Sequence, residues 1–396
     1  MNPLSLREFH HGLRANFSEL NGAEIVNDYG DWLAEHAALR ETAGVIDLSF
    51  RSRICLTGAD RVRFLHGQVT NDVKKLRVGE GCYAAITTAK GKMESDLNIL
   101  ALADELLLDF EPGLTEKISA RLEKFIVSDD VQIVDAAPHY GLLSAQGPKA
   151  VDVVRALNLF PEIPTKQFDS LKISDATLGE IHLANNPRLD GTQGRAGSPL
   201  PAVGAHGVTR PASFGFDLFI PNNFLGAVAD KLIAAAKQIG GRAVGWTAFE
   251  AARIEAGVPR FGADMDETNI PLECGIESRA IVYNKGCYIG QEVINRIHSV
   301  GHVTRELRGL RLAANLESLP KKGDKLFHAG KEVGYVTSAV KSPALNALVA
   351  PKHLGEGGNI ALGYVRREAN QIGNELTLRT VAGESPANIV ELPFVK

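Results

Sequence analysis

The chain has 396 residues, of which 44% are hydrophobic and 23% charged, and its formal net charge is −4. A chain of this length exceeds the size at which one core usually keeps growing, so we expect two or three packed units. The nearly balanced charge offers no polybasic surface for nucleic acid. Because the first residues lack an apolar leader and no later stretch is long and apolar enough to cross a bilayer, we expect a cytoplasmic protein without a membrane partner.

Helices and strands alternate irregularly over the first three hundred residues, beginning with a predicted helix at 31–40 and a predicted strand at 53–57. This mixture predicts an α+β fold. A stretch rich in Gly, Pro, Asn and Ser at 185–213 is typical of a long loop. Turn residues then separate six strand-like segments at 307–312, 325–327, 332–339, 360–365, 375–379 and 387–392. They predict a small antiparallel barrel at 304–396, after a larger region at 1–303.

The four cysteines are Cys55, Cys82, Cys274 and Cys287. They are widely spaced, and no pair stands at the spacing of a metal finger, so we expect no disulfide framework, no metal site and no permanent iron–sulfur cluster. Cys55 and Cys82 lie in strand-like segments, which favours small buried hydrophobes. His298 and His302 are four residues apart, but Gly301 interrupts the helical pattern, and we expect both to be solvated.

The strongest local signal is the segment KGCYIGQE at 285–292, which leads into a helical pattern. Two glycines bracket Cys287 just before the expected helix start. Backbone N–H groups there, and the ammonium of Lys285, would stabilise a thiolate, so Cys287 is a candidate reactive thiol. The alternative is a tight turn in which the glycines supply unusual dihedrals and Cys287 only packs. The candidate functional motif comprises Lys285, Gly286, Cys287, Tyr288, Gly290, Gln291 and Glu292.

A second candidate is Asp96, in a segment at 90–97 that is typical of a hairpin turn entering a strand. A carboxylate at the entry of a buried strand can face a cavity and accept hydrogen bonds from an amine or a pterin-type ligand. The alternative is a turn or cap residue at the surface. The segment alone leaves both interpretations open.

Segments in the correct order over some 360 residues resemble the glycine-cleavage T-protein superfamily. They are EHAALRETAGVIDLS at 35–49, the helix and turn at 65–73, the stretch at 129–148 that ends in QGP, GFDLFIP at 215–221, RIEAG at 253–257 and the end of the chain at 392–394. Within the superfamily, KGCYIGQE resembles the YgfZ branch rather than the true T-proteins.

The resemblance implies a multi-part frame around a central channel that holds tetrahydrofolate or a one-carbon-substituted form. It assigns the channel carboxylate to Asp96 and a pterin-binding acid to Asp217, and it implies two further folate-binding residues, Tyr83 in the strand pair lining the channel and Arg253 in a matching segment. A carboxylate suits a pterin because the pterin edge presents adjacent N–H donors, which two oxygens accept together. Asp96 and Cys287 are the residues expected to carry chemistry.

Three positions depart from the T-protein pattern. Ser95 stands where the family has an aspartate, Phe249 where it has an arginine and Arg210 where it has a tyrosine. The resemblance therefore implies a tetrahydrofolate-binding, YgfZ-like factor for assembly or repair of iron–sulfur enzymes, with Cys287 as its thiol and client or assembly proteins as partners. One alternative is an aminomethyltransferase, or another folate-dependent one-carbon transferase, that uses Asp96. The other is a module that acts only through protein contacts.

Overall fold

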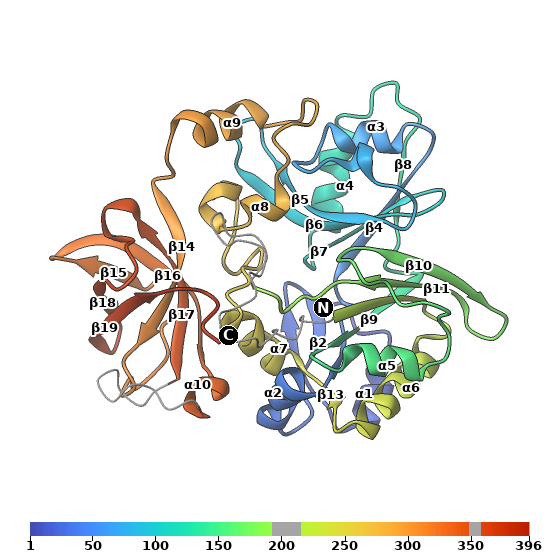
Figure 1. Ribbon diagram of the computed structural model, residues 1–396, viewed down its shortest axis with the longest axis horizontal. Helices are drawn as coiled ribbons and strands as arrows, with labels where there is room; N and C mark the ends of the chain where they lie inside the picture. The colour runs from blue at the N-terminus through green and yellow to red at the C-terminus, as the bar shows by residue number, and fades with distance from the viewer. Residues whose placement is uncertain (192–214, 348–357, 396) are drawn as a thin grey trace, which may run out of the picture.

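The computed structural model describes residues 1–191, 215–347 and 358–395. These residues form two sheets that face each other, helices that cover the outer sides of the sheets, and a closed barrel beside them (Figure 1). The three parts surround the middle of the molecule, and the amino-terminal elements lie at their junction. The predicted α+β fold with a small carboxyl-terminal barrel is confirmed.

The first sheet has the strand order β5-β6-β7-β4-β8 and is antiparallel throughout. Its strands are β4 (Ser52–Thr57), β5 (Gly81–Thr87), β6 (Met93–Ala101), β7 (Leu106–Phe110) and β8 (Gln132–Asp135), and helices α3 (Arg61–His66) and α4 (Thr115–Glu123) cover one face. Along β6, Leu97 and Ile99 pack into the core under these helices. Because side chains alternate along a strand, Asp96 and Asn98 point to the opposite face, toward the second sheet.

The second sheet has the order β10-β11-β12-β9-β3-β13, and only the β3–β13 pair is parallel. Its strands are β3 (Gly44–Asp47), β9 (Tyr140–Gln146), β10 (Ser170–Asp175), β11 (Gly179–Asn185), β12 (Gly215–Pro221) and β13 (Arg242–Ala243), with helices α5 (Ala150–Ala156) and α6 (Leu225–Gln238) on its outer face. Leu218 and Ile220 of β12 pack against these helices. The alternate residues Asp217 and Phe219 therefore face the first sheet.

A shared apolar layer holds the two sheets together. Phe219 of the second sheet packs with Leu100 and Leu107 of the first. Fully buried Arg53 adds a polar tie, because its guanidinium donates hydrogen bonds to the carbonyl of Tyr140 in β9 as well as to carbonyls beside its own strand. The inner faces of both sheets are thus fixed relative to each other, which matters for any site built from both.

The remaining elements lie outside the two large sheets and the barrel, some between these parts and others at the edges of the molecule (Figure 1). They are α1 (Arg7–Gly12), β1 (Asn16–Leu20), β2 (Ala23–Asp28), α2 (Trp32–Glu41), η1 (Val73–Lys75), α7 (Trp246–Glu255), η2 (Pro271–Cys274), α8 (Glu277–Ala280) and α9 (Gln291–Val300). The helix predicted at 31–40 is α2, and the strand predicted at 53–57 is β4. Both lie within a residue of their expected bounds.

The barrel closes in the order β14-β17-β16-β15-β18-β19. Its elements are β14 (Arg305–Leu312), β15 (Lys325–His328), β16 (Lys331–Lys341), α10 (Pro343–Ala347), β17 (Asn359–Arg366), η3 (Arg367–Ala369), β18 (Glu375–Thr380) and β19 (Gly383–Val390). All six predicted strands are present, and a closed barrel leaves no edge strand unpaired. The chain enters the barrel directly after α9; the division of domains at 303 stays a prediction.

Four further expectations concern the cysteines and histidines, the long loop, a membrane span and a metal site. Cys55 and Cys82 are buried as predicted, and His298 and His302 lie at the surface as predicted. Most of the loop expected at 185–213, including Arg210, lies outside the described residues. Within the described ranges no helix is both long and apolar enough to span a bilayer, and no three His, Cys, Asp or Glu side chains group as metal ligands.

Candidate functional site

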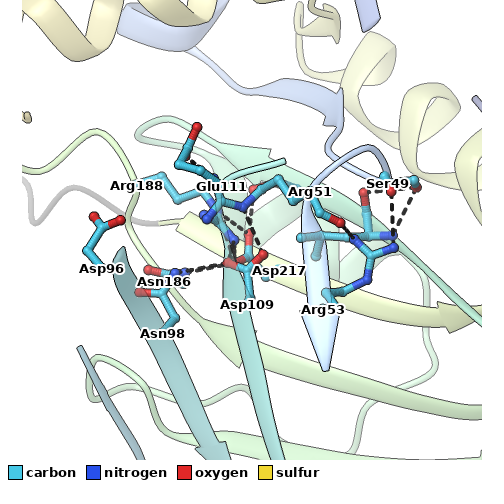
Figure 2. A network of polar contacts seen from close by, with 12 residues as sticks. Ser49, Arg51, Arg53, Asp96, Asn98, Asp109, Glu111, Asn186, Arg188 and Asp217 are labelled. Carbon is cyan, nitrogen blue, oxygen red and sulfur yellow. Dashed lines mark hydrogen bonds and ion pairs between the residues drawn. The ribbon is translucent and has the colours of Figure 1, made fainter. Parts of the chain in front are cut away.

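Buried polar side chains gather where the inner faces of the two sheets meet. Asn98 of β6 pairs across the strands with Asp109 of β7, so their side chains stand next to each other on the inner face of the first sheet. Asp217 of β12 faces them from the second sheet, and Figure 2 shows Asp96 at the edge of the same cluster. The sheets thus bring together residues that are far apart in sequence, including two of the predicted site residues, Asp96 and Asp217.

Asp96 accepts a hydrogen bond of 2.7 Å from the hydroxyl of Tyr83, a second predicted site residue in the adjacent strand β5. Burial, with the negative charge of Glu111 adding to it, raises the pKa of Asp96, although the Tyr83 hydrogen bond opposes the shift. The Arg279 guanidinium lies 4.4 Å from the centre of the Tyr83 ring and holds that ring in place. A carboxyl group whose pKa is shifted toward neutrality is suited to proton transfer.

Asp217 is 1% exposed, and both of its oxygens are hydrogen-bonded. The Ser144 hydroxyl donates to Oδ1 at 2.7 Å, and the Asn186 amide donates to Oδ2 at 2.8 Å. Arg188 approaches from the front: its Nε lies 3.0 Å from each oxygen, and its Nη2 donates to Oδ2 at 2.6 Å. A guanidinium fork against a carboxylate is among the strongest side-chain pairs.

Asp109 links this pair to the first sheet. It accepts hydrogen bonds from Arg188 Nη2 at 2.8 Å, from Arg51 Nε at 2.8 Å and from the Asn98 amide at 3.0 Å (Figure 2). Burial would raise the pKa of Asp109, but the charges and hydrogen bonds of Arg51 and Arg188 outweigh it and hold that pKa well below its usual range. Asp109 therefore favours its ionised form in the folded protein.

Arg253 lies at the other end of a buried chain of ion pairs that begins here. The chain runs from Asp109 through Arg51, Glu111, Arg260 and Glu250 to Arg253 and Asp264. Arg253 donates to Ser338 of the barrel at 2.9 Å, and Thr337 of the barrel donates to Asp264 at 2.6 Å. The structure thus places Arg253 where α7 meets the barrel, and not with the cluster around Asp217.

The space beside Asp217 is small. A cavity of about 10 Å³ is lined by Asn98, Leu100, Leu107, Asp109, Phe168, Ala184, Asn186, Asp217 and Phe219. That volume accommodates about one water molecule. The polar groups around Asp217 therefore leave little free space in this structure.

Lys285 has a structural role in the KGCYIGQE segment. Its ammonium donates three hydrogen bonds, each 2.7 Å long, to the carbonyls of His66, Val69 and Asn71. Burial lowers the pKa of Lys285 to about 8. Because an ammonium has three N–H donors, none is left for a thiolate. Support of a Cys287 thiolate by the positive charge of Lys285 stays a prediction, and it would not come from a hydrogen bond, because the three donors are used.

The rest of the segment is pinned to the hairpin between β5 and β6. Gly290 has φ +90° at the start of α9, and a Cβ there would lie 2.6 Å from Thr87 Oγ1 and from the Thr88 carbonyl. The Thr87 hydroxyl donates to the Ile289 carbonyl at 2.7 Å. Tyr288 packs into the core, and its buried hydroxyl has no hydrogen-bond partner among the described residues. The Lys285 ammonium lies 5.0 Å from the centre of the Tyr288 ring.

Cys287 is exposed in this turn, unlike the other three cysteines of the chain, which are buried. Gly286 precedes it, where a Cβ would meet the ring of His66 at 3.3 Å, and Gln291 and Glu292 open α9. The turn thus presents one thiol to solvent on a fixed backbone. The segment contacts the β5–β6 hairpin at Thr87 and Thr88, whereas Asp96 and Asp217 belong to the polar cluster between the sheets (Figure 2). The predicted residues therefore form two separate places.

Several residues of the cluster were missed by sequence reasoning. Asp109 and Asn98 each interrupt an apolar strand, and a polar residue in a buried strand was a usable signal for both. Arg51 precedes a buried strand with no such signal. Asn186 and Arg188 follow β11 at the start of the region interpreted as a loop, and only the pairing of β11 with β12 brings them to Asp217.

The fold and the cluster define an α+β frame with a buried polar cluster between two sheets. Residues 6–185 and 211–285 match the GCVT N-terminal domain, and residues 305–351 match the glycine cleavage T-protein C-terminal barrel domain. The chain belongs to the glycine cleavage T-protein family.

Known relatives span the whole chain. The chain is 26% identical over 388 residues to the aminomethyltransferase of Halalkalibacterium halodurans, and the alignment covers 96% of each protein. It is 28% identical over 379 residues to the aminomethyltransferase of Geobacillus kaustophilus, covering 96% of this chain and 94% of the relative. The crystal structure of glycine cleavage system aminomethyltransferase T from Bartonella henselae superposes with a TM-score of 0.82 at 22% identity, covering 100% and 98% of the two chains, and shows that the fold is shared.

Proposed function

We propose that the protein binds tetrahydrofolate, or a one-carbon-substituted form of it, between the two sheets, and acts as an aminomethyltransferase-type one-carbon transferase. The observation that carries the proposal is the pair of acids on facing sheets, of which Asp217 is buried and Asp96 partly buried. Asp217 offers two fixed oxygens to a pterin edge, and Asp96 stands across from it with a raised pKa. The full-length similarity to proteins named aminomethyltransferase supports the same reaction class.

The residues around Asp217 fit the chemistry of a pterin. A pterin presents a ring N–H and an exocyclic amino group side by side, and a carboxylate accepts both at once. Ser144 and Asn186 fix the carboxylate from behind, so its orientation does not depend on the ligand. Phe219, Leu100 and Leu107 supply apolar surface for the flat faces of the rings. Folate, when bound, supplies the nitrogens that carry the one-carbon unit.

Asp96 is proposed to hold and deliver a proton near those nitrogens. Its burial and the Tyr83 hydroxyl set its protonation state and its direction, and Arg279 fixes Tyr83. A positioned acid of this kind typically contributes 10²- to 10⁴-fold to a rate. The position before it carries Ser95, fully buried on the opposite face, so only one carboxylate of the expected pair is present. Asp96 alone would carry the proton transfer.

A second candidate function is the YgfZ-like one, a folate-binding factor for assembly or repair of iron–sulfur enzymes. The specific observation that favours it is Cys287, exposed at the tip of a turn whose backbone is fixed by Lys285 and Gly290. A fixed, solvent-facing thiol is suited to contact with a partner protein. Phe249, stacked on Trp246 where the transferase pattern has an arginine, also points away from glycine cleavage.

Two measurements test these functions. Purified protein is titrated with tetrahydrofolate, and methylene-tetrahydrofolate formation is followed after addition of an aminomethylated lipoyl carrier protein. The transferase proposal expects turnover in the wild type and a loss of at least about a hundredfold in Asp96→Asn. Folate binding without turnover would eliminate the transferase. If Cys287→Ser then lowers the activities of iron–sulfur enzymes in cells, the second function replaces the first; if no folate binds at all, a module acting through protein contacts is favoured.

A further inference from the structure

The strongest unexplained feature of the site is that Asp217 is already occupied by a side chain of the same protein. We propose that Arg188 is an internal stand-in for the pterin edge, and that it must leave Asp217 before folate binds. Arg188 then sets the affinity, and restricts binding to ligands that present two adjacent N–H donors. This inference rests on the proposed folate site and adds a selectivity residue that the sequence pattern did not contain.

The hydrogen-bonding capacity of Asp217 is already used by side chains of the protein. A carboxylate has about four lone-pair positions. Ser144 takes one on Oδ1 and Asn186 one on Oδ2, and the fork of Arg188 engages both oxygens from the remaining side. Because the carboxylate is then saturated, a ligand gains its own pair of hydrogen bonds only by replacing Arg188.

The guanidinium of Arg188 and the edge of a pterin present similar pairs of hydrogen-bond donors. Arg188 offers an Nε–H and an Nη2–H from one planar guanidinium, at 3.0 Å and 2.6 Å from Asp217. A pterin offers the same arrangement at N3–H and its 2-amino group, two N–H groups in one plane on nitrogens that share a carbon. A ligand with a single donor, or with an acceptor in either position, cannot make both replacements. The carboxylate would therefore select for amidine-like edges.

The free space beside Asp217 is too small for a pterin. The cavity of about 10 Å³ beside Asp217 holds one water molecule and not a two-ring heterocycle. The apolar residues that would flank the rings, Phe219, Leu100 and Leu107, pack with one another across the sheets. Withdrawal of the Arg188 guanidinium is the change that frees hydrogen-bonding positions on both oxygens of Asp217.

Arg188 has a second partner that lets it move without stranding a charge. Its Nη2 also donates to Asp109 at 2.8 Å, and Asp109 keeps Arg51 and Asn98 in either case. Arg188 can therefore turn from Asp217 toward Asp109 and remain ion-paired. Since the displacing pterin edge is neutral, keeping the guanidinium nearby preserves the charge balance of the buried cluster.

The test compares wild type, Arg188→Ala and Arg188→Lys by stopped-flow and equilibrium binding of tetrahydrofolate. Arg77→Ala serves as the matched control, because Arg77 is an exposed arginine paired with Glu80 outside the site. If about one molecule in ten has Asp217 free, removing Arg188 tightens the dissociation constant about tenfold and raises the association rate by a similar factor. Arg188→Lys, which offers a point charge in place of a fork, should fall between the two.

A second readout does not depend on folate. In Arg188→Ala, guanidinium ion at non-denaturing concentration should bind beside Asp217, and should compete with tetrahydrofolate; in the wild type it should do neither. Thermal unfolding checks that each variant is folded, and Arg188→Lys replaces Arg188→Ala in these comparisons if the alanine variant is not.

The outcomes separate the two levels of the proposal. Weaker folate binding in both Arg188 variants, or equal binding and equal association rates in all proteins, would overturn the stand-in role while leaving the folate site in place. If no protein binds folate but guanidinium binds Arg188→Ala only, the proposed function fails and the paired-donor site stands. If neither ligand binds any variant, both are wrong.

Discussion

The buried ion pairs of Asp109 give a prediction whose size and pH dependence follow from the structure. Asp109 is 2% exposed and accepts hydrogen bonds from two arginines, Arg51 and Arg188, and from Asn98. Asp109→Asn keeps the shape but removes the charge that compensates both guanidinium groups. Breaking a buried pair in this way typically costs 3–5 kcal/mol in the free energy of unfolding. We expect a loss of about 4 kcal/mol at pH 7.

The pH dependence distinguishes this explanation from a packing defect. The folded-state pKa of Asp109 lies below its unfolded value, which is about 3.9. Its contribution is therefore fully present above that unfolded pKa and is lost as the pH falls toward the folded pKa. Urea unfolding of wild type and Asp109→Asn at pH 7, 5 and about 3 should show a difference that is constant between the first two and narrower at the last.

A difference that stays the same down to the lowest pH would refute the electrostatic account, because a cavity or a changed hydrogen bond does not titrate. A loss below about 1 kcal/mol at pH 7 would refute the claim that Asp109 compensates two buried cations. Asp175→Asn is the matched control, since Asp175 is a surface aspartate that caps a turn with Thr177.

Three further predictions concern the segment at 285–292 and the channel acid. Lys285→Met should lower the free energy of unfolding by about 2–4 kcal/mol in urea titrations, because three buried carbonyls lose their donor, whereas Cys287→Ser should change it by less than about 0.5 kcal/mol. Gly290→Ala should cost about 1–3 kcal/mol in the same assay, since the backbone is left-handed and a Cβ meets Thr87. Burial raises the pKa of Asp96 in the folded protein, so its contribution to stability is present below the unfolded pKa and is lost as the pH rises through the folded pKa. The free energy of unfolding of Asp96→Asn, relative to that of the wild type, should therefore be higher at pH 8 than at pH 5 in urea titrations.

Each of these has an outcome that contradicts it. Equal stability of Lys285→Met and wild type would mean that Lys285 does not clamp the carbonyls of 66–71. A stable Gly290→Ala would mean that the turn before α9 relaxes at low cost. An Asp96→Asn variant with the same pH profile as the wild type would remove the argument that burial controls this carboxyl group.

The sequence predicted the barrel well because its information is local. Turn residues separate six short alternating strands, and each strand appears within a few residues of its expected bounds. The burial of Cys55 and Cys82 was predicted from local sequence in the same way, because each lies within a strand-like apolar segment. Local signals of this kind need no knowledge of which strands pair.

The site was predicted only in part, because it depends on contacts between distant segments. Asp96 was a candidate from its local segment and Asp217 came from resemblance alone, and the structure brings them to facing sheets. Arg188 was missed, since its position beside Asp217 follows from the pairing of β11 with β12 and from nothing local. Lys285 shows the reverse case: its place beside Cys287 in sequence suggested support for a thiolate, but its ammonium reaches three carbonyls of a segment more than two hundred residues away.

The central claim is that Asp217 holds the pterin edge of a reduced folate between the sheets. Isothermal titration of tetrahydrofolate into wild type and Asp217→Asn tests it most directly, because the amide replaces one acceptor oxygen by a donor and removes the charge. Loss of a charge-assisted bidentate pair is worth about 3 kcal/mol, so the account predicts binding by the wild type that weakens about a hundredfold in the variant. Equal affinities of the two proteins, or no binding to the wild type, would contradict it.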